Sequence, residues 1–150
     1  MFANQRGLYY DMWTFRHKTM CPVDVWEEVL DYSMKNKVSD EIAYENTLKK
    51  RKFYLNENDP PLEVDSAFGG FGIYKIHYVL KNKKFYIGLK SKIINKNKNQ
   101  IIKWQVCEHV QFNSGLKDIG GKLYILPYLI NGENEEGDFP ASFFRYLIFK

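Results

Sequence analysis

With 150 residues, of which 45% are apolar, the chain can bury one core, and we expect a single domain over residues 1–150. Its net charge of +4, from 22 basic and 18 acidic residues, is too balanced for a protein that binds mainly by neutralising phosphates, so no nucleic-acid partner is expected. Cys21 and Cys107 form neither a disulfide framework nor a Cys-x-x-Cys zinc site, which favours reduced thiols in a cytoplasmic protein.

No apolar run reaches the roughly 18 residues that a membrane-spanning helix needs, and the first residues lack the apolar core of a signal peptide. We therefore expect no transmembrane segment, and any membrane contact would be peripheral. Lysine clusters at residues 49–52 and again at residues 81–98. Such runs are typical of solvated faces, and contact with an anionic membrane surface or an anionic acceptor is the alternative.

Aromatic residues make up 17% of the chain, which suits the lining of a sugar or nucleotide site but also a tyrosine-rich core. The aromatic run at residues 8–16 predicts a mostly buried strand. Asp11 lies within this run, and a buried carboxylate is costly unless it is paired. It either forms an ion pair with Arg16 or His17 or lies near a ligand.

Two helices are expected next. Asp24 can cap the first, which is predicted over residues 25–34. The second is predicted over residues 39–52, because an acidic first turn after Ser39 and a basic last turn both match the helix dipole. Its apolar face is narrow.

The remainder of the chain is expected to alternate loops, strands and one or two further helices. Up to residue 100 we expect a polar loop at 53–63, the glycine-rich segment at 66–72, a strand at 76–80 with His77 satisfied or exposed, a turn at 81–84, a short strand at 85–88 and a loop at 90–100. We then expect a strand at 101–106, a helix at 108–119 ended by Gly120-Gly121, a strand at 122–126 closed by Pro127 and extended chain at 128–131. An acidic loop at 133–138 and a terminal helix at 139–150, either docked or interfacial, complete the chain. These elements predict an α/β fold with a mixed sheet and flanking helices.

Two segments carry residues suited to a site. Residues 66–72 hold three glycines in four positions, which suits backbone that passes close to a ligand, although a structural bulge gives the same pattern. Glu108 and His109 place a carboxylate beside an imidazole at a helix start, as a general base or metal ligand requires. The alternative for Glu108 is an ordinary first-turn carboxylate, which the helix dipole favours by about 0.3–1 kcal/mol.

Three blocks of the sequence also carry a family resemblance. The blocks YYDMWTFRH (9–17), SAFGGFGIYK (66–75) and CEHVQFN (107–113), followed by Pro127 and Ile130-Asn131, resemble the C-terminal half of GT-A-type glycosyltransferases. The likeness is to the enzymes of large DNA viruses and of bacterial surface-polysaccharide pathways. It rests on the order and co-occurrence of the blocks over most of the chain.

The resemblance implies that two halves of the enzyme have different roles. In that family a nucleotide-sugar donor binds a Rossmann-like N-terminal half, where an Asp-x-Asp motif holds a divalent metal, manganese or magnesium, against the diphosphate. The half that follows supplies the acceptor site, with Glu108 in the position of the catalytic base and His109 as a metal or diphosphate contact. The substrate contacts that it implies are Asp11, Trp13, Ser66, Phe68, Gly69 and Gly70.

This sequence contains no Asp-x-Asp motif, and no nucleotide-binding half precedes Tyr9. The chain therefore resembles the second half of a transferase, either a split or truncated product or a domain paired with a separate N-terminal donor-binding half. We expect it to act on a sugar acceptor and to need that half for activity. The alternative is a non-catalytic carbohydrate- or partner-binding module that retains the fold.

Overall fold

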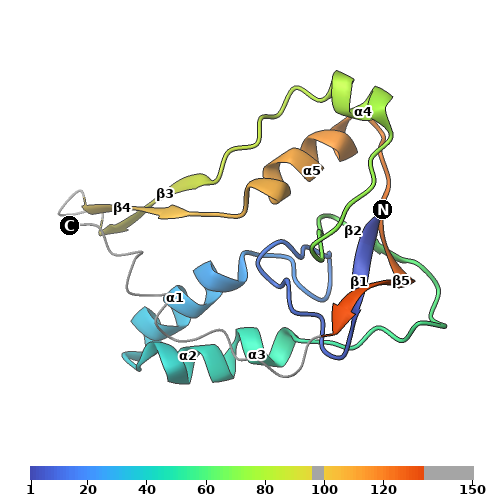
Figure 1. Cartoon of the computed structure of the whole chain (residues 1–150). Helices are drawn as coiled ribbons and strands as arrows, with labels where there is room; N and C mark the ends of the chain where they lie inside the picture. The colour runs from blue at the N-terminus through green and yellow to red at the C-terminus, as the bar shows by residue number, and fades with distance from the viewer. Residues whose placement is uncertain (96–99, 134–150) are drawn as a thin grey trace.

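The computed structural model describes residues 1–95 and 100–133 and folds them as a mixed α/β structure, which confirms that part of the predicted fold class (Figure 1). The elements are β1 (Phe2–Arg6), α1 (Val25–Asn36), α2 (Asp40–Asn46), α3 (Leu48–Arg51), β2 (Leu62–Val64), α4 (Ile76–Lys81), β3 (Leu89–Asn95), β4 (Gln100–Gln105), α5 (Glu108–Asp118) and β5 (Leu123–Glu133). The predicted terminal helix and residues 134–138 of the acidic loop lie outside the described residues.

A three-stranded mixed sheet has β5 as its middle strand, parallel to β1 and antiparallel to β2. The pairing with β1 is irregular, because Phe2 lies opposite Ile125 but Asn4 lies opposite Ile130. Pro127 falls in this interval and has no N–H to give to a ladder, and its carbonyl accepts a hydrogen bond of 3.0 Å from the Asn4 side chain. The strand predicted to close at this proline instead continues through it.

The chain that follows the glycines lies along the other edge of β1. The Met1 amino group and carbonyl each hydrogen-bond to Ile73 at 2.8 Å, and the Ala3 N–H donates to the Phe71 carbonyl at 3.0 Å. Phe2 and Gly72 pair antiparallel between these contacts. The glycine-rich segment is thus anchored to the sheet.

Residues 8–17 form a folded loop, and the predicted strand is wrong. The Phe15 N–H donates to the Asp11 carbonyl at 3.2 Å, which closes a turn in the middle of the run. Tyr9, Met12 and Phe15 are nevertheless buried in the core. The aromatic composition therefore reported burial but not backbone conformation, since a loop that fills a core needs the same side chains as a buried strand.

The first predicted helix is confirmed as α1, and its cap is the expected one. The Asp24 carboxylate accepts hydrogen bonds from the N–H groups of Trp26 at 3.0 Å and Glu27 at 3.2 Å. The single helix predicted after it is divided into α2 and α3 at Thr47, where φ is −123° and ψ is −87°. The Thr47 hydroxyl donates to the Ala43 carbonyl at 2.7 Å, a bond that competes with the regular backbone pattern and favours a bend.

Two predicted strands between the glycines and β4 are absent from the described chain. Residues 76–80 form α4, because Ile76 and Leu80 are four positions apart and fit one helix face as well as alternate strand positions. Residues 85–88 belong to no strand, and the Ile87 N–H donates to the Phe85 carbonyl at 3.1 Å.

The predicted lysine-rich loop instead supplies β3 and the first residue of β4, which pair antiparallel as a separate hairpin. The predicted strand at 101–106 and helix at 108–119 are confirmed as β4 and α5. Gly120, at φ +85°, ends α5 as expected, and the Gly121 N–H donates to the Leu116 carbonyl at 2.9 Å.

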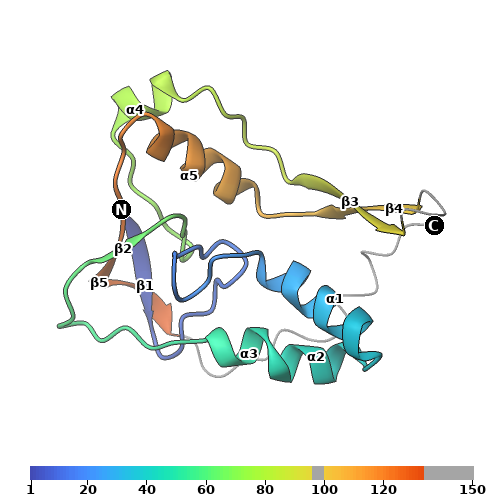
Figure 2. The ribbon, with the colours of Figure 1, turned by 180° about the vertical axis from the view of Figure 1, so that it is seen from behind.

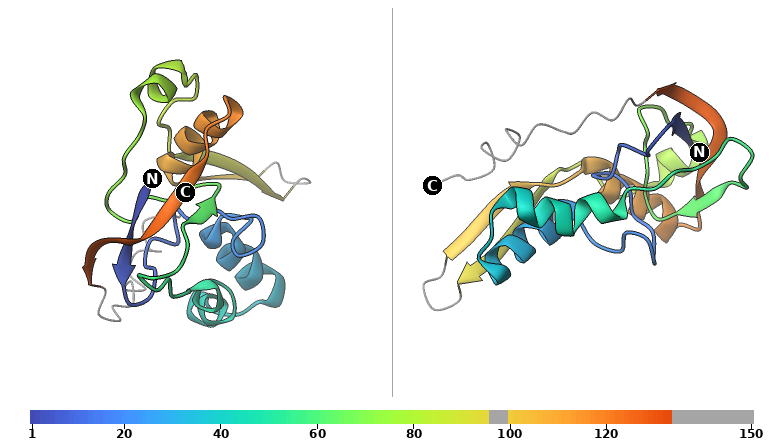
Figure 3. Two further views of the ribbon diagram at one scale, coloured as in Figure 1. Left: turned by 90° about the vertical axis from the view of Figure 1, so that its right-hand side faces the viewer. Right: turned by 90° about the horizontal axis from the view of Figure 1, so that it is seen from below.

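The helices lie on two sides of the loop at residues 8–17, which we call the central loop. Figures 1 and 2 show α1, α2 and α3 on one side, α5 and α4 on the other, and the sheet at one end. The β3–β4 hairpin extends away from the sheet, as the view from below in Figure 3 also shows. Within the described ranges no helix is long and apolar enough to cross a membrane.

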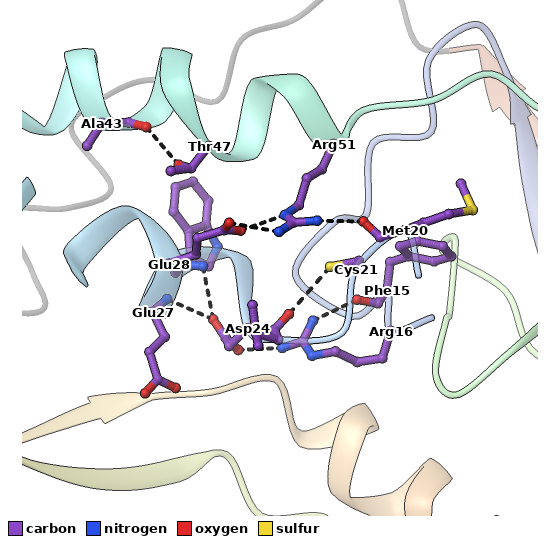
Figure 4. Close-up of polar contacts among 12 residues, drawn as sticks. Phe15, Arg16, Met20, Cys21, Asp24, Glu27, Glu28, Ala43, Thr47 and Arg51 are labelled. Carbon is purple, nitrogen blue, oxygen red and sulfur yellow. Dashed lines mark hydrogen bonds and ion pairs between the residues drawn. The ribbon is translucent and has the colours of Figure 1, made fainter. Parts of the chain in front are cut away.

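Arg16 ties the loop at residues 8–17 to the start of α1, and Arg51 ties α3 to α1 (Figure 4). Arg16 lies 2.5 Å from the Asp24 carboxylate, with side chains only 11% and 9% exposed, and it also donates to the carbonyls of Trp13 and Phe15. Arg51 of α3 donates to both carboxylate oxygens of Glu28 on α1, at 2.5 and 2.7 Å. The predicted pairing of Arg16 with Asp11 is therefore wrong, because Arg16 pairs with the carboxylate that caps α1.

We predict that R16L lowers the free energy of unfolding by about 3–5 kcal/mol, because it leaves the Asp24 carboxylate buried without its partner. The matched control is R6L, which removes a pair with Glu57 whose side chains are 60% and 51% exposed. That change is expected to cost less than about 1 kcal/mol. Urea unfolding followed by tryptophan fluorescence measures both, and equal losses would contradict the prediction.

Candidate functional site

Residues 65–68 lie against α5, and the two segments meet through side chains spaced one turn apart on a single face of the helix. We call this contact the α5–glycine seam. The pairs along it are His109 stacked on Phe68 with ring centroids 4.1 Å apart, Asn113 bonded to Ser66 and Ala67, and Lys117 paired with Asp65. The helix start and the glycine-rich segment, separated in sequence, are therefore one structural unit.

Asn113 has a polar side chain and is fully buried in the seam. Its amide nitrogen donates to the Ser66 hydroxyl at 2.9 Å and to the Ala67 carbonyl at 3.1 Å. Its amide oxygen accepts a hydrogen bond of 3.2 Å from the Tyr74 hydroxyl. Both ends of the amide are thus satisfied, which a buried polar side chain requires.

Gly69 and Gly70 form the turn at the end of the seam, with φ of +63° and +80°. The Asp11 carboxylate accepts a hydrogen bond of 3.2 Å from the Gly69 N–H, and the Asn131 side chain donates to the Gly69 carbonyl at 3.2 Å. A Cβ at Gly69 would lie 2.3 Å from the Ala3 carbonyl oxygen. The close approach that the glycines permit is therefore made to β1, which favours the structural alternative for this segment.

Asp11 consequently belongs to the same place as the glycine turn. Its carboxylate is bonded to a backbone N–H, and the two ion pairs that the sequence suggested for it, with Arg16 or His17, are not formed. The Asp11 carboxylate acts to raise the pKa of His109 and of Tyr86, so both side chains lie within electrostatic reach of it.

Tyr86 lies across the start of α5. Its hydroxyl is 2.6 Å from Nε2 and 3.0 Å from Nδ1 of His109. Burial, assisted by the Glu108 carboxylate, raises the pKa of Tyr86 to about 12, so the phenol keeps its proton at neutral pH. Asp11, Tyr86, Glu108 and His109 thus form one cluster at the outer end of the seam.

His109 of the cluster and the adjacent Cys107 are held in their neutral forms. Burial lowers the pKa of His109, against the opposing influence of Glu108 and Asp11, so its imidazole is uncharged at neutral pH. Burial raises the pKa of the Cys107 thiol, which contacts the Thr14 hydroxyl at 3.6 Å. A protonated, buried thiol of this kind is chemically inert.

The other predicted contacts lie further inside. Ser66 is buried and its hydroxyl accepts the hydrogen bond from Asn113. The carbonyl of Trp13 accepts a hydrogen bond from Arg16 at 3.0 Å, while its indole N–H is buried without a hydrogen-bond partner in the described part of the chain. Phe68 stacks on His109 and Gly69 is bonded to Asp11, whereas Ser66 and Trp13 are bonded to Asn113 and Arg16.

The described residues contain no group of three or more His, Cys, Asp or Glu side chains placed to hold a metal ion. The nitrogens of His109 lie next to the Tyr86 hydroxyl, the nearer one at 2.6 Å.

A separate pocket of about 800 Å³ lies between α1 and α5, on the helix face that carries Val110 and Ser114. Its acidic residues are Asp24, Glu27, Glu28, Asp31 and Asp65, and Arg16 also lines it. Neither Glu108 nor His109 belongs to its lining. The pocket and the cluster are therefore distinct features on different faces of α5.

Sequence reasoning did not assign roles to Asn113, Tyr86 or Asn131. A signal existed for Asn113, because an asparagine four residues after His109 in a helix interior is an unfavourable choice unless it has a specific partner. Tyr86 gave no such signal. Comparison of the chain with protein-family models, with curated proteins and with solved structures finds no match.

We predict that G69A destabilises the protein by more than G120A. Both positions have positive φ, which costs an alanine roughly 1–2 kcal/mol, but only at Gly69 would the new methyl group meet backbone, at 2.3 Å, while Gly120 has open space. Overpacking adds about 1–3 kcal/mol. Chemical denaturation of both variants measures the difference, and equal destabilisation would show that the contact with β1 is not close.

We predict that folding stability falls as the pH drops below about 6.5, and that H109F removes part of this dependence. Because the pKa of His109 is lowered in the folded protein, the unfolded chain binds more protons in this range, so stability is present above the unfolded value and lost below it. Melting temperatures between about pH 5.5 and pH 7.5 report the effect. H77Q, at an exposed ring on α4, is the matched control, and an H109F profile parallel to that of the original protein would contradict the prediction.

Proposed function

We propose that this chain is a glycosyltransferase-like domain that supplies acceptor binding and a candidate base for sugar transfer from a nucleotide-sugar. The observation that supports the proposal is the meeting of three separated sequence blocks at one place. Asp11, the Phe68-Gly69 turn and Glu108-His109 come from blocks that resemble GT-A-type enzymes, and they join at the outer end of the α5–glycine seam.

Glu108 is the candidate base. Sugar transfer requires removal of a proton from an acceptor hydroxyl, and a positioned carboxylate is one of the groups that do this. Glu108 is partly exposed in the first turn of α5, where the helix dipole favours a negative charge. The acceptor proton would pass to its carboxylate as the new glycosidic bond forms at the oxygen.

The neighbouring side chains would position the acceptor. Tyr86 is 52% exposed and presents an aromatic face beside Glu108, which suits stacking against a sugar ring. The neutral His109 ring, stacked on Phe68, contacts the Tyr86 hydroxyl and so fixes where that face lies. His109 is thus a positioning residue in this proposal.

The nucleotide-sugar donor and its divalent metal, manganese or magnesium, are assigned to a separate N-terminal donor-binding half. When bound there, the metal would neutralise the departing diphosphate. The absence of an Asp-x-Asp motif in this sequence supports that assignment.

We predict that E108Q lowers the rate of sugar transfer by at least about 100-fold, because glutamine cannot accept the proton. The assay follows transfer from a panel of nucleotide-sugars with manganese, using this chain alone and mixed with a donor-binding half that carries an Asp-x-Asp motif. E45Q, at an exposed position on α2, is the matched control. Equal rates for E108Q and the original protein would exclude Glu108 as the base.

The alternative is a non-catalytic carbohydrate- or partner-binding module. Its specific support is the exposed aromatic surface near the seam, where Tyr86 is 52% and Phe71 is 46% exposed. Glycan binding that is lost in Y86A, retained in E108Q and unaccompanied by transfer in every mixture would favour this function.

A further inference from the structure

The positive charge of the protein is concentrated in one part of the sequence. Nine of the 22 basic residues and none of the 18 acidic residues lie between Ser66 and Cys107. The rest of the chain holds 13 basic residues against 18 acidic ones and is net negative. The modest overall charge therefore conceals one cationic segment.

Part of this segment forms an exposed apolar edge. We call residues 75–87, which comprise Lys75, α4 and the irregular chain after it, the α4 edge. Ile76 and Leu80 are 67% and 78% exposed and lie one turn apart on the same face of α4. Phe85 and Ile87 are 75% and 44% exposed in the chain after α4, where the Ile87 N–H donates to the Phe85 carbonyl at 3.1 Å.

The other side of the edge is fixed to α5. The Asn82 side chain donates to the Phe112 carbonyl at 2.9 Å, and the Lys84 amine donates to the Ser114 hydroxyl at 3.0 Å. Tyr86 completes this row through its contact with His109. Figures 1 and 2 show α4 and the following chain lying along the outer side of α5. The chain that carries the exposed apolar side chains is therefore fixed to α5 by Asn82, Lys84 and Tyr86.

Exposed lysines flank these apolar side chains. Lys75 precedes α4, Lys81 is its last residue and Lys83 follows it, all three on the surface. Residues 75–87 contain no acidic residue, and the neighbouring Asp118 of α5 is paired with Lys84 at 2.7 Å. Exposed apolar and aromatic side chains combined with lysines have the chemistry of an interface for anionic lipids. Nucleic-acid interfaces are predominantly polar, so they would leave Ile76, Leu80 and Phe85 without a role.

We propose that the α4 edge is a peripheral binding surface for an anionic lipid bilayer. Charge complementarity selects the occupant, because the segment has only positive formal charges while its outward side chains are apolar. The proposal is independent of sugar transfer, since it requires neither donor nor acceptor.

The test is cosedimentation of the full chain with phosphatidylcholine vesicles, with and without about 30% phosphatidylserine. We expect binding only to the anionic vesicles. K81Q combined with K83Q should weaken it about 30-fold, or about fivefold for each lysine, and L80S combined with F85S should weaken it at least about tenfold. The matched control is M34S combined with I42S, at positions 48% and 49% exposed on α1 and α2, and it should bind as the original protein does.

Several outcomes would overturn the proposal. These are equal binding to neutral vesicles, or anionic binding that neither pair of substitutions weakens while circular dichroism shows that the variants are folded. Lysine-dependent binding to an oligonucleotide without vesicle binding would assign the surface to nucleic acid. Self-association without vesicle binding, seen by sedimentation velocity and lost in the L80S and F85S variant, would assign it to a second copy of the chain.

Discussion

The buried amide of Asn113 fixes how α5 lies on the residues before the glycines. Its two hydrogen-bond donors and its acceptor oxygen are matched by Ser66, Ala67 and Tyr74, and a shift of one residue along the helix would leave them buried without partners. Because positions four apart share a helix face, this register also sets His109 on Phe68 and Lys117 beside Asp65. The position of the candidate base therefore follows from a core contact.

The glycine turn extends the same constraint to the sheet. Gly69 is bonded on one side to Asp11 in the central loop and on the other to Asn131 in β5, and it lies against the Ala3 carbonyl. The close packing that glycine allows is accounted for by the protein's own backbone. A ligand would accordingly meet the outer end of the seam, at Tyr86 and Glu108, more readily than the glycines themselves.

Local signals in the sequence predicted the elements that depend on them. Asp24 and Gly120 located the ends of α1 and α5, because caps act through adjacent backbone groups. The loop at 8–17 was mistaken for a strand, since its conformation depends on distant partners such as Ser66 and Gly69. In the site, the adjacency of Glu108 and His109 was predictable, whereas the contacts of Asn113 with residues 46 and 47 positions away in the sequence were not.

The two carboxylates of the cluster, Asp11 and Glu108, have similar neighbours but different hydrogen bonds. Burial raises the pKa of Tyr86 to about 12 and raises that of the Cys107 thiol, and it lowers the pKa of His109. The neighbours of the carboxylates are thus neutral at pH 7. The Asp11 carboxylate is occupied by the Gly69 N–H and its movement would disturb the turn, whereas Glu108 begins a helix at a partly exposed position. Proton transfer at Glu108 therefore disturbs the fold least, and this is the physical reason to prefer it over Asp11 as the base.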